Sequence, residues 1–148
     1  MSVLVDIDNV CAYNALPDNA LIEQWVTVSV DGLRGRAELC LRVVDEAESE
    51  AMNTQYRGQH KPTNVLSFPS GLPESFDPPL LGDLVICASV VAREAEEQGK
   101  TLQAHWAHML VHGVLHLLGF DHVEDGEAEL MEAREIAILK KLGFANPY

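Results

Sequence analysis

The sequence predicts an α+β domain, and three observations lead to this expectation. Four short segments carry the apolar pattern of strands, two of them with strict alternation of apolar and polar residues. Five longer segments carry apolar residues at helical spacing and are bounded by capping or helix-stopping residues. Neither a repeat nor a low-complexity linker divides the 148 residues. We therefore expect one domain over residues 1–148.

In the first half of the chain, strand and helix patterns alternate. Each helix candidate here opens near an aspartate that can cap its first turn. Acidic residues also follow Asp45 directly, where they favour the positive end of a helix dipole. The expected elements are a strand at 2–8; a helix from Pro17 and Asp18 with the apolar stripe Leu21, Ile22 and Trp25; a strand at 36–44 with Ala37, Leu39, Leu41 and Val43 on one face; and a helix from Asp45 to Gly58.

In the second half, two short strand patterns precede three helix patterns. A loop rich in proline and glycine separates the two strands. The expected elements are a strand at 64–69; a strand at 80–88; a helix from a cap at Ser89 to Gly99; a long helix from a cap at Thr101 to a stop at Gly119; and a last helix within 123–144, with Leu130, Ala133, Ile136 and Leu139 inside, Lys140 and Lys141 in its last turn and Gly143 as its stop.

The charge of the chain is strongly acidic, with a formal net charge of −13. Taken alone, this charge argues against non-specific binding to nucleic acid. The basic residues are unevenly distributed, however, and two interpretations stay open: a local basic surface, or scattered solubilising charge. Five of the ten basic residues lie between positions 34 and 61, namely Arg34, Arg36, Arg42, Arg57 and Lys61.

The cysteines and the N-terminal residues indicate a cytoplasmic protein. The three cysteines are odd in number and form no CxxC motif, so we expect reduced thiols. The first ten residues carry acids where a signal peptide would carry basic residues. No apolar run approaches the roughly 18 residues that a membrane span needs. We therefore expect no membrane association.

The stretch HGVLHLLGFDH, residues 112–122, has the spacing of a metal site. His112 and His116 lie on one face of the expected helix in adjacent turns, so they can hold one ion. Gly119 can adopt the positive φ of a sharp turn, which lets His122 reach the same ion. Three imidazoles leave a fourth position for water, as in catalytic zinc sites. Copper or nickel would also suit three imidazoles, so the metal identity stays open.

Gly113 stands where the zinc-protease signature H-E-x-x-H-x-x-G-x-x-H has its catalytic glutamate. Metal coordination alone lowers the pKa of a bound water to about 7. Phosphodiester cleavage depends mostly on positioning and on neutralising charge at phosphorus. Amide hydrolysis also needs protonation of a poor leaving amine, so losing the glutamate harms a protease more. Gly113 thus favours phosphodiester chemistry, with a metallopeptidase-like hydrolase as the alternative.

These motifs resemble those of a known family. HGVLHLLGFDH resembles the H-G-x-L-H-L-x-G-[YF]-D-H signature of the YbeY family of bacterial endoribonucleases. YRGQHKPTNVLSFP, residues 56–69, is similar to the family segment Y-R-x-K-D-x-P-T-[DN]-V-L-S-F-P. LLGDLVICASVVAREAEEQGK and AHWAHMLVHG also resemble family sequence, so the likeness covers essentially the whole chain. It implies a zincin-like α+β fold with a small mixed four-stranded sheet, and a metal site on a long helix and the turn after it.

The resemblance also implies an activity. YbeY proteins cleave single-stranded RNA with one metal ion, usually taken as zinc, which His112, His116 and His122 would hold here. Family members act in small-subunit rRNA 3′-end processing and in 70S ribosome quality control. RNA and the small ribosomal subunit or its assembly factors would therefore be the partners. A non-catalytic ribosome-assembly factor, whose metal only shapes a binding surface, is a further alternative.

Arg57 matches the family arginine thought to matter for activity, so we expect it to be catalytic. The Lys-Asp that usually follows in the family is replaced here by Gln59 and His60. Lys61 could replace the lost cation as a substrate-binding residue. Two aspartates are open to two interpretations. Asp121 would orient a ligand imidazole or act as a base, or else only form the turn. Asp83 would support the site or face solvent as a strand residue.

Overall fold

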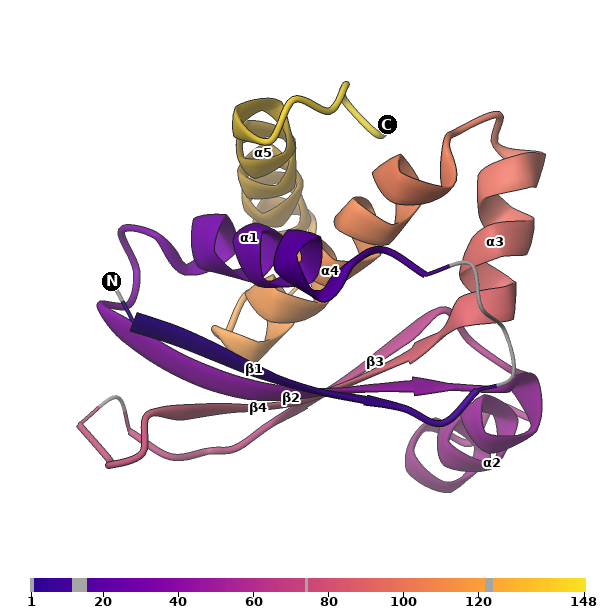
Figure 1. Cartoon of the computed structure of the whole chain (residues 1–148), viewed down its shortest axis with the longest axis horizontal. Coiled ribbons are helices and arrows are strands. Elements are labelled where there is room, and N and C mark those ends of the chain that lie inside the picture. The colour runs from indigo at the N-terminus through magenta and orange to yellow at the C-terminus, as the bar shows by residue number, and fades with distance from the viewer. Residues whose placement is uncertain (1, 12–15, 74, 122–123) are drawn as a thin grey trace.

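The computed structural model describes residues 2–11, 16–73, 75–121 and 124–148. Four strands and five helices follow one another in the described residues (Figure 1). The strands are β1 (Ser2–Asn9), β2 (Arg36–Val44), β3 (Val65–Pro69) and β4 (Leu80–Cys87). The helices are α1 (Asn19–Val30), α2 (Glu46–Arg57), α3 (Ala88–Glu97), α4 (Leu102–Leu117) and α5 (Asp125–Lys141).

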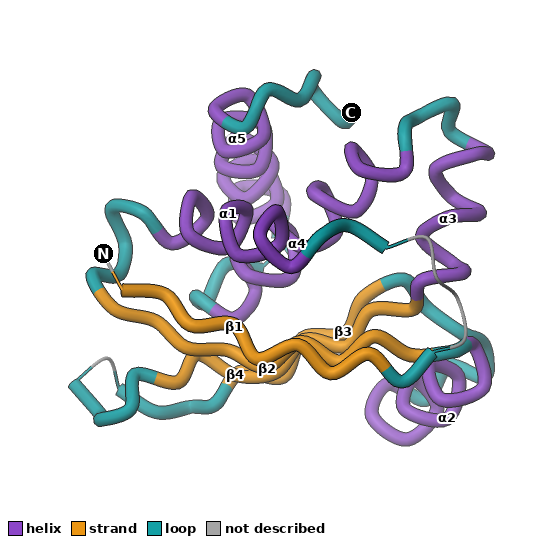
Figure 2. The backbone as a smooth tube through the Cα atoms, in the orientation of Figure 1, coloured by secondary structure: helices purple, strands orange, loops and turns teal. Residues whose placement is uncertain are grey.

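The strands form one mixed sheet in the order β1-β2-β4-β3. β1, β2 and β4 run parallel, and β3 pairs antiparallel with β4 at one edge. Helices α1, α4 and α5 lie on one side of the sheet and α2 lies on the other (Figures 1 and 2). The expected α+β fold with a small mixed four-stranded sheet is confirmed.

Helix α4 is the centre of the fold. It contacts α1, α3, α5, β3 and β4, and its residues 105–111 are all buried. Thr101 accepts a hydrogen bond from the backbone N–H of Ala104, so the expected cap is confirmed. Gly119, with φ of 101°, follows the helix end as expected. Because residues 105–111 of α4 are buried, the polar side chains among them need partners inside the molecule.

Helix α3 begins earlier than the sequence pattern predicts. Its N-cap is Cys87, the last residue of β4, and not Ser89. No loop separates β4 from α3, because the strand ends at Cys87 and the helix begins at Ala88. The helix ends at Glu97, and Gly99 follows it with φ of 66°.

The inner face of α5 also differs from the expectation. Of the four residues expected inside, Leu139 is buried and Ile136 is half-buried, but Leu130 is 60% exposed and Ala133 is exposed. Met131, Glu135 and Ile138 are buried in their place. Hydrophobicity alone predicts that α5 buries the face that carries Leu130, because this orientation leaves Glu135 exposed to water. In the structure Glu135 faces inward, where it has polar partners described below.

Within the described part of the chain, none of the helices is both long and apolar enough to cross a membrane.

Candidate metal centre and active site

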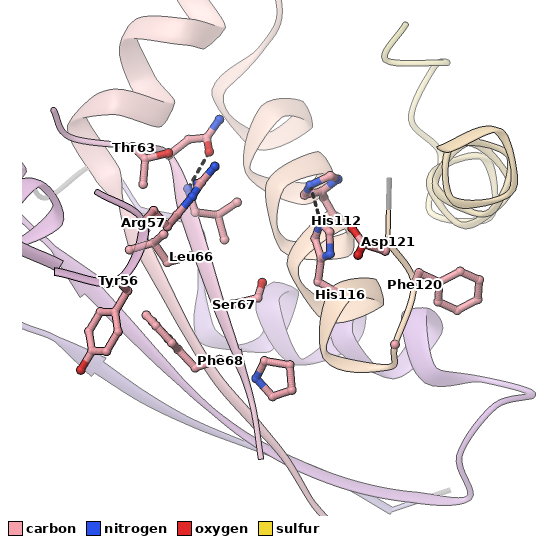
Figure 3. Close-up of a pocket in the computed structure, with 14 residues that line it drawn as sticks. Tyr56, Arg57, Thr63, Leu66, Ser67, Phe68, His112, His116, Phe120 and Asp121 are labelled. Atoms are coloured by element: carbon pink, nitrogen blue, oxygen red, sulfur yellow. Dashed lines mark hydrogen bonds between the residues drawn. The ribbon is translucent and has the colours of Figure 1, made fainter. Parts of the chain in front are cut away.

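A cavity of about 840 Å³, here called the main cavity, opens at the β3 edge of the sheet. Its described lining comes from three places: the end of α2, the segment 63–69 that includes β3, and the end of α4 with the following turn. Figure 3 shows Arg57 on one side and His112 and His116 on the other, with Ser67 of β3 between them. The structure thus brings together residues that lie more than fifty positions apart.

Helix α2 presents Arg57 to this cavity at its last residue. Gly58 ends the helix in the left-handed region, with φ of 69°, as the sequence predicts. The chain then turns back toward β3. Buried Ser49 fixes this return, because its hydroxyl donates to the carbonyl of Thr63 and accepts from the Thr63 N–H, both at 2.9 Å. Arg57 itself is exposed, so its guanidinium is accessible to a substrate.

Lys61 lies outside the described residues that line the main cavity, and its side chain is exposed. Its carbonyl accepts a hydrogen bond of 2.9 Å from the side chain of Asn53. The backbone at Lys61 is therefore anchored to α2, and its ammonium group extends from the same short connection that follows Arg57.

His112 and His116 approach each other through their Nε2 atoms, which are 3.1 Å apart. Two zinc–nitrogen bonds of about 2.0–2.1 Å at the tetrahedral angle separate their nitrogens by about 3.3–3.4 Å. The pair is therefore close to the spacing that one zinc ion needs. His122 lies outside the described residues. Among the residues that the structure describes, no group of three histidine, cysteine or acidic residues is arranged to hold a metal.

Glu135 of α5 holds His112 in one orientation. Its side chain is fully buried, and Oε1 lies 2.5 Å from Nδ1 of His112. Burial alone would raise the pKa of Glu135, but contacts with His108, His112 and Tyr148 outweigh it and lower the pKa to about 2. The carboxylate is thus ionised and accepts the Nδ1 proton. The Nε2 atom of His112 is left as the nitrogen with a lone pair, which is the arrangement typical of metal-binding histidines.

Tyr148 completes this group from the C-terminal segment. Its hydroxyl donates to Oε2 of Glu135 and lies 3.3 Å from Nε2 of His108. Burial, together with the negative charge of Glu135, raises the pKa of Tyr148, so the hydroxyl stays protonated. The sequence reading missed Glu135 and Tyr148. The sequence feature that could have indicated Glu135 is its helical spacing with Met131 and Ile138. These three residues share one face of the helix, which places an acid among apolar residues.

His105 has a partner that is independent of the histidine pair. Its Nε2 atom lies 2.8 Å from Oε1 of Glu94, and the same carboxylate accepts from the side-chain amide of Asn64. Burial would raise the pKa of Glu94, but the hydrogen bonds from His105 and Asn64 prevail and lower it. His105 thus links α4 to α3 and to the segment before β3.

Gly113 lies where α4 touches the sheet. A Cβ atom at this position would be 2.9 Å from Cδ2 of Leu84 and 3.3 Å from Cγ2 of Val65. The hydroxyl of Ser67 donates to the carbonyl of Gly113 at 3.2 Å. Packing therefore favours a glycine here, because a larger side chain would be directed against Leu84 of β4 and Val65 of β3.

The two aspartates of interest lie in different places. Asp121 lines the main cavity next to the turn after α4. Asp83 is absent from that lining and contributes to a separate cavity on the other face of the sheet, with Asp6 and Asp8. A supporting role for Asp83 at the histidine pair is therefore wrong, because the sheet separates the two.

Comparison with known proteins agrees with this fold. The solution structure of TM1509 from Thermotoga maritima matches with a TM-score of 0.58 and 23% sequence identity, covering 97% of this chain and 92% of that chain. At this identity the likeness shows the fold alone. Residues 9–143 match the sequence model of a family described as Endoribonuclease YbeY. The chain belongs to the endoribonuclease YbeY family.

Proposed function

We propose that this chain is a single-strand-specific, metal-dependent endoribonuclease of one domain, residues 1–148. Family membership implies a hydrolase that acts on RNA in rRNA maturation. We assign it to small-subunit rRNA 3′-end processing and 70S ribosome quality control in the cytoplasm, with the small subunit or its assembly factors as partners. The observation that carries the proposal is one cavity lined by both Arg57 and the pair His112 and His116.

His112, His116 and His122 hold one zinc ion in this proposal. The Nε2 separation of 3.1 Å and the hydrogen bond from His112 to Glu135 both support it. A zinc ion held by these residues would supply Lewis-acid chemistry at the scissile phosphate. Glu135 and Tyr148 keep His112 in the ligand orientation, since their hydrogen bonds fix which imidazole nitrogen carries the proton.

Arg57 binds the scissile phosphate. Its planar guanidinium can donate two parallel hydrogen bonds to phosphate oxygens, and it stays charged at any physiological pH. The exposed side chain of Lys61 contacts the RNA backbone beside it as a point charge. A cation on one wall and a Lewis acid on the other suit phosphodiester cleavage, because charge develops on the phosphate oxygens.

The metallopeptidase alternative receives less support from the same cavity. A zinc protease needs a glutamate on the metal-binding helix, and Gly113 has no space for one. Asp121 is the one carboxylate among the described lining residues, and it lies in the turn after the helix.

The test compares wild type with His116→Ala and with Arg93→Ala, a control on α3 outside the main cavity. Each preparation is assayed for bound metal and for cleavage of single-stranded RNA and of casein. We expect His116→Ala to lose both metal and RNA cleavage, Arg93→Ala to keep both, and casein to stay intact. RNA cleavage that survives in metal-free His116→Ala would instead indicate a contaminating nuclease.

The non-catalytic alternative needs a test in cells. The His116→Ala variant is expressed in a strain that lacks the gene, and rRNA 3′ ends are mapped. We expect unprocessed 3′ ends. Normal rRNA maturation by a variant without metal would mean that binding, and not cleavage, is the essential role.

A further inference from the structure

Three aromatic side chains besides the histidines belong to the described lining of the main cavity, namely Tyr56, Phe68 and Phe120. Aromatic rings matter for a protein that acts on single strands, because unpaired bases stack on them with little regard to sequence. A base can stack only on a ring that has an accessible face. The three rings differ in this respect.

Phe68 and Phe120 are half-buried and are occupied by contacts within the protein. Phe68 packs against an apolar cluster that includes Leu66 and Val85. Phe120 packs against the main core, and the guanidinium carbon of Arg134 lies 5.8 Å from its ring centroid. Both rings therefore serve packing, and neither presents a free face to a base.

Tyr56 is the accessible ring, because the residue is 58% exposed. It is the last residue but one of α2 and directly precedes Arg57. Its ring makes an edge contact with Phe68, with centroids 5.0 Å apart and planes at 72% of a right angle or more excluded from stacking by their angle of 68°. Figure 3 shows both rings on the same side of Ser67 as Arg57, opposite the histidine pair. The Tyr56 ring is thus held beside β3 and remains open to solvent.

We propose that Tyr56 stacks on a base of the RNA strand, next to the nucleotide whose phosphate Arg57 binds. This inference rests on the proposed nuclease function and adds the contact that selects single strands. Consecutive α carbons are about 3.8 Å apart, so the ring and the guanidinium extend from one point of α2. The bases of a duplex are paired and stacked on one another, whereas a base of a single strand can turn out onto the ring.

The charges around the two rings favour a base over a phosphate at this place. Both rings also line the cavity of about 550 Å³ on the other face of the sheet, together with Asp6, Asp8, Asp83 and Arg42. Arg42 is itself paired with Asp8 at 2.7 Å and with Glu48 at 2.6 Å. Like charge repels a phosphate backbone from these carboxylates, but an uncharged base meets no such repulsion.

The test varies the ring and the base together. Wild type is compared with Tyr56→Leu, Tyr56→Phe and Tyr56→Trp, and with Gln55→Ala, an exposed neighbour on α2 outside the described lining of the main cavity. Binding is measured by fluorescence anisotropy with a 2′-O-methyl oligouridylate of about 6 nucleotides. A series of the same strand carries one abasic nucleotide at each position in turn.

We expect Tyr56→Leu to bind the intact strand about tenfold more weakly than wild type, which is the effect of losing one stacked base. Tyr56→Phe and Tyr56→Trp keep an aromatic face, so they and the Gln55→Ala control should bind within about twofold of wild type. At one abasic position, wild type should also bind about tenfold more weakly. Wild type and Tyr56→Leu should bind that abasic strand alike, because the contact is already lost.

The results that would overturn the proposal are distinguishable from a failure of the nuclease function. If wild type binds the intact strand and Tyr56→Leu binds it equally well, no base stacks on the ring, and the nuclease function stands. If Tyr56→Leu weakens binding of every abasic strand as much as of the intact one, the ring acts through the structure of α2 and the proposal is wrong. If wild type neither binds nor cleaves single-stranded RNA, the proposed function fails as well.

Discussion

At the scale of single residues, the buried carboxylate of Glu135 connects fold and chemistry. It lies at the centre of a hydrogen-bonded group in which His112 and Tyr148 both donate to it. A fully buried charge is costly without such partners. The same contacts that make its burial tolerable also fix the imidazole of His112, so one set of bonds serves stability and metal binding.

Replacing Glu135 by Gln should weaken metal binding about 10- to 100-fold, because the residue no longer fixes the orientation of a ligand. The amide is nearly isosteric with the carboxylate, so the fold should persist. Zinc affinity is measured by competition with a chromophoric chelator. Tyr148→Phe should give a smaller loss, and Glu132→Gln, an exposed neighbour on α5, should give none. If Glu135→Gln binds zinc as tightly as wild type, the claim that Glu135 orients His112 for metal binding is contradicted.

At the scale of elements, the contact of α4 with the sheet depends on Gly113. Replacement by Ala puts a methyl group 2.9 Å from Leu84, which is fully buried and has little room to move. We expect a net loss of about 1–2 kcal/mol in the free energy of unfolding, since overpacking outweighs the gain in helix propensity. The measurement is urea denaturation of the metal-free protein.

Gly126→Ala on α5 is the matched control, because no atom lies within 4 Å of its added methyl group. It should be neutral or stabilising by up to about 1 kcal/mol. Equal stability of the two variants would mean that α4 can shift away from the sheet at no cost.

The link between α3 and α4 predicts a pH dependence. The folded-state pKa of Glu94 lies below its usual value of 4.5. A lowered carboxyl pKa contributes stability that is fully present above pH 4.5 and is lost as pH falls through the folded pKa. Wild type should therefore lose stability in this acid range more steeply than Glu94→Gln. Parallel curves of unfolding free energy against pH for the two proteins would contradict the link.

The sequence predicts most element boundaries but not the orientation of every element. Thr101, Gly58 and Gly119 end or start helices where local capping rules place them. The prediction for the inner face of α5 was correct for Leu139 but wrong for Leu130 and Ala133. The hydrophobic pattern places Glu135 in water, whereas its polar partners in the folded protein make its burial tolerable. The predicted start of α3 at Ser89 was wrong, because capping rules apply to helices that follow a loop and this helix follows β4 directly.

At the scale of the whole molecule, the site depends on topology that spacing cannot reveal. The pair His112 and His116 follows from the helical period alone. That Arg57 lines the same cavity follows from β3 being an antiparallel edge strand, with α2 and α4 on opposite sides of the sheet. The two sequence motifs contain Arg57 and the pair His112 and His116, and the fold brings these residues into one cavity.

The measurement that tests the central claim most directly is the cleavage rate of Arg57→Ala at measured metal content. If Arg57 and the metal act on one phosphate, the variant binds as much metal as wild type and cleaves single-stranded RNA about 10²–10³-fold more slowly. Wild-type cleavage at equal metal content would contradict the claim that this cavity is the site of the reaction.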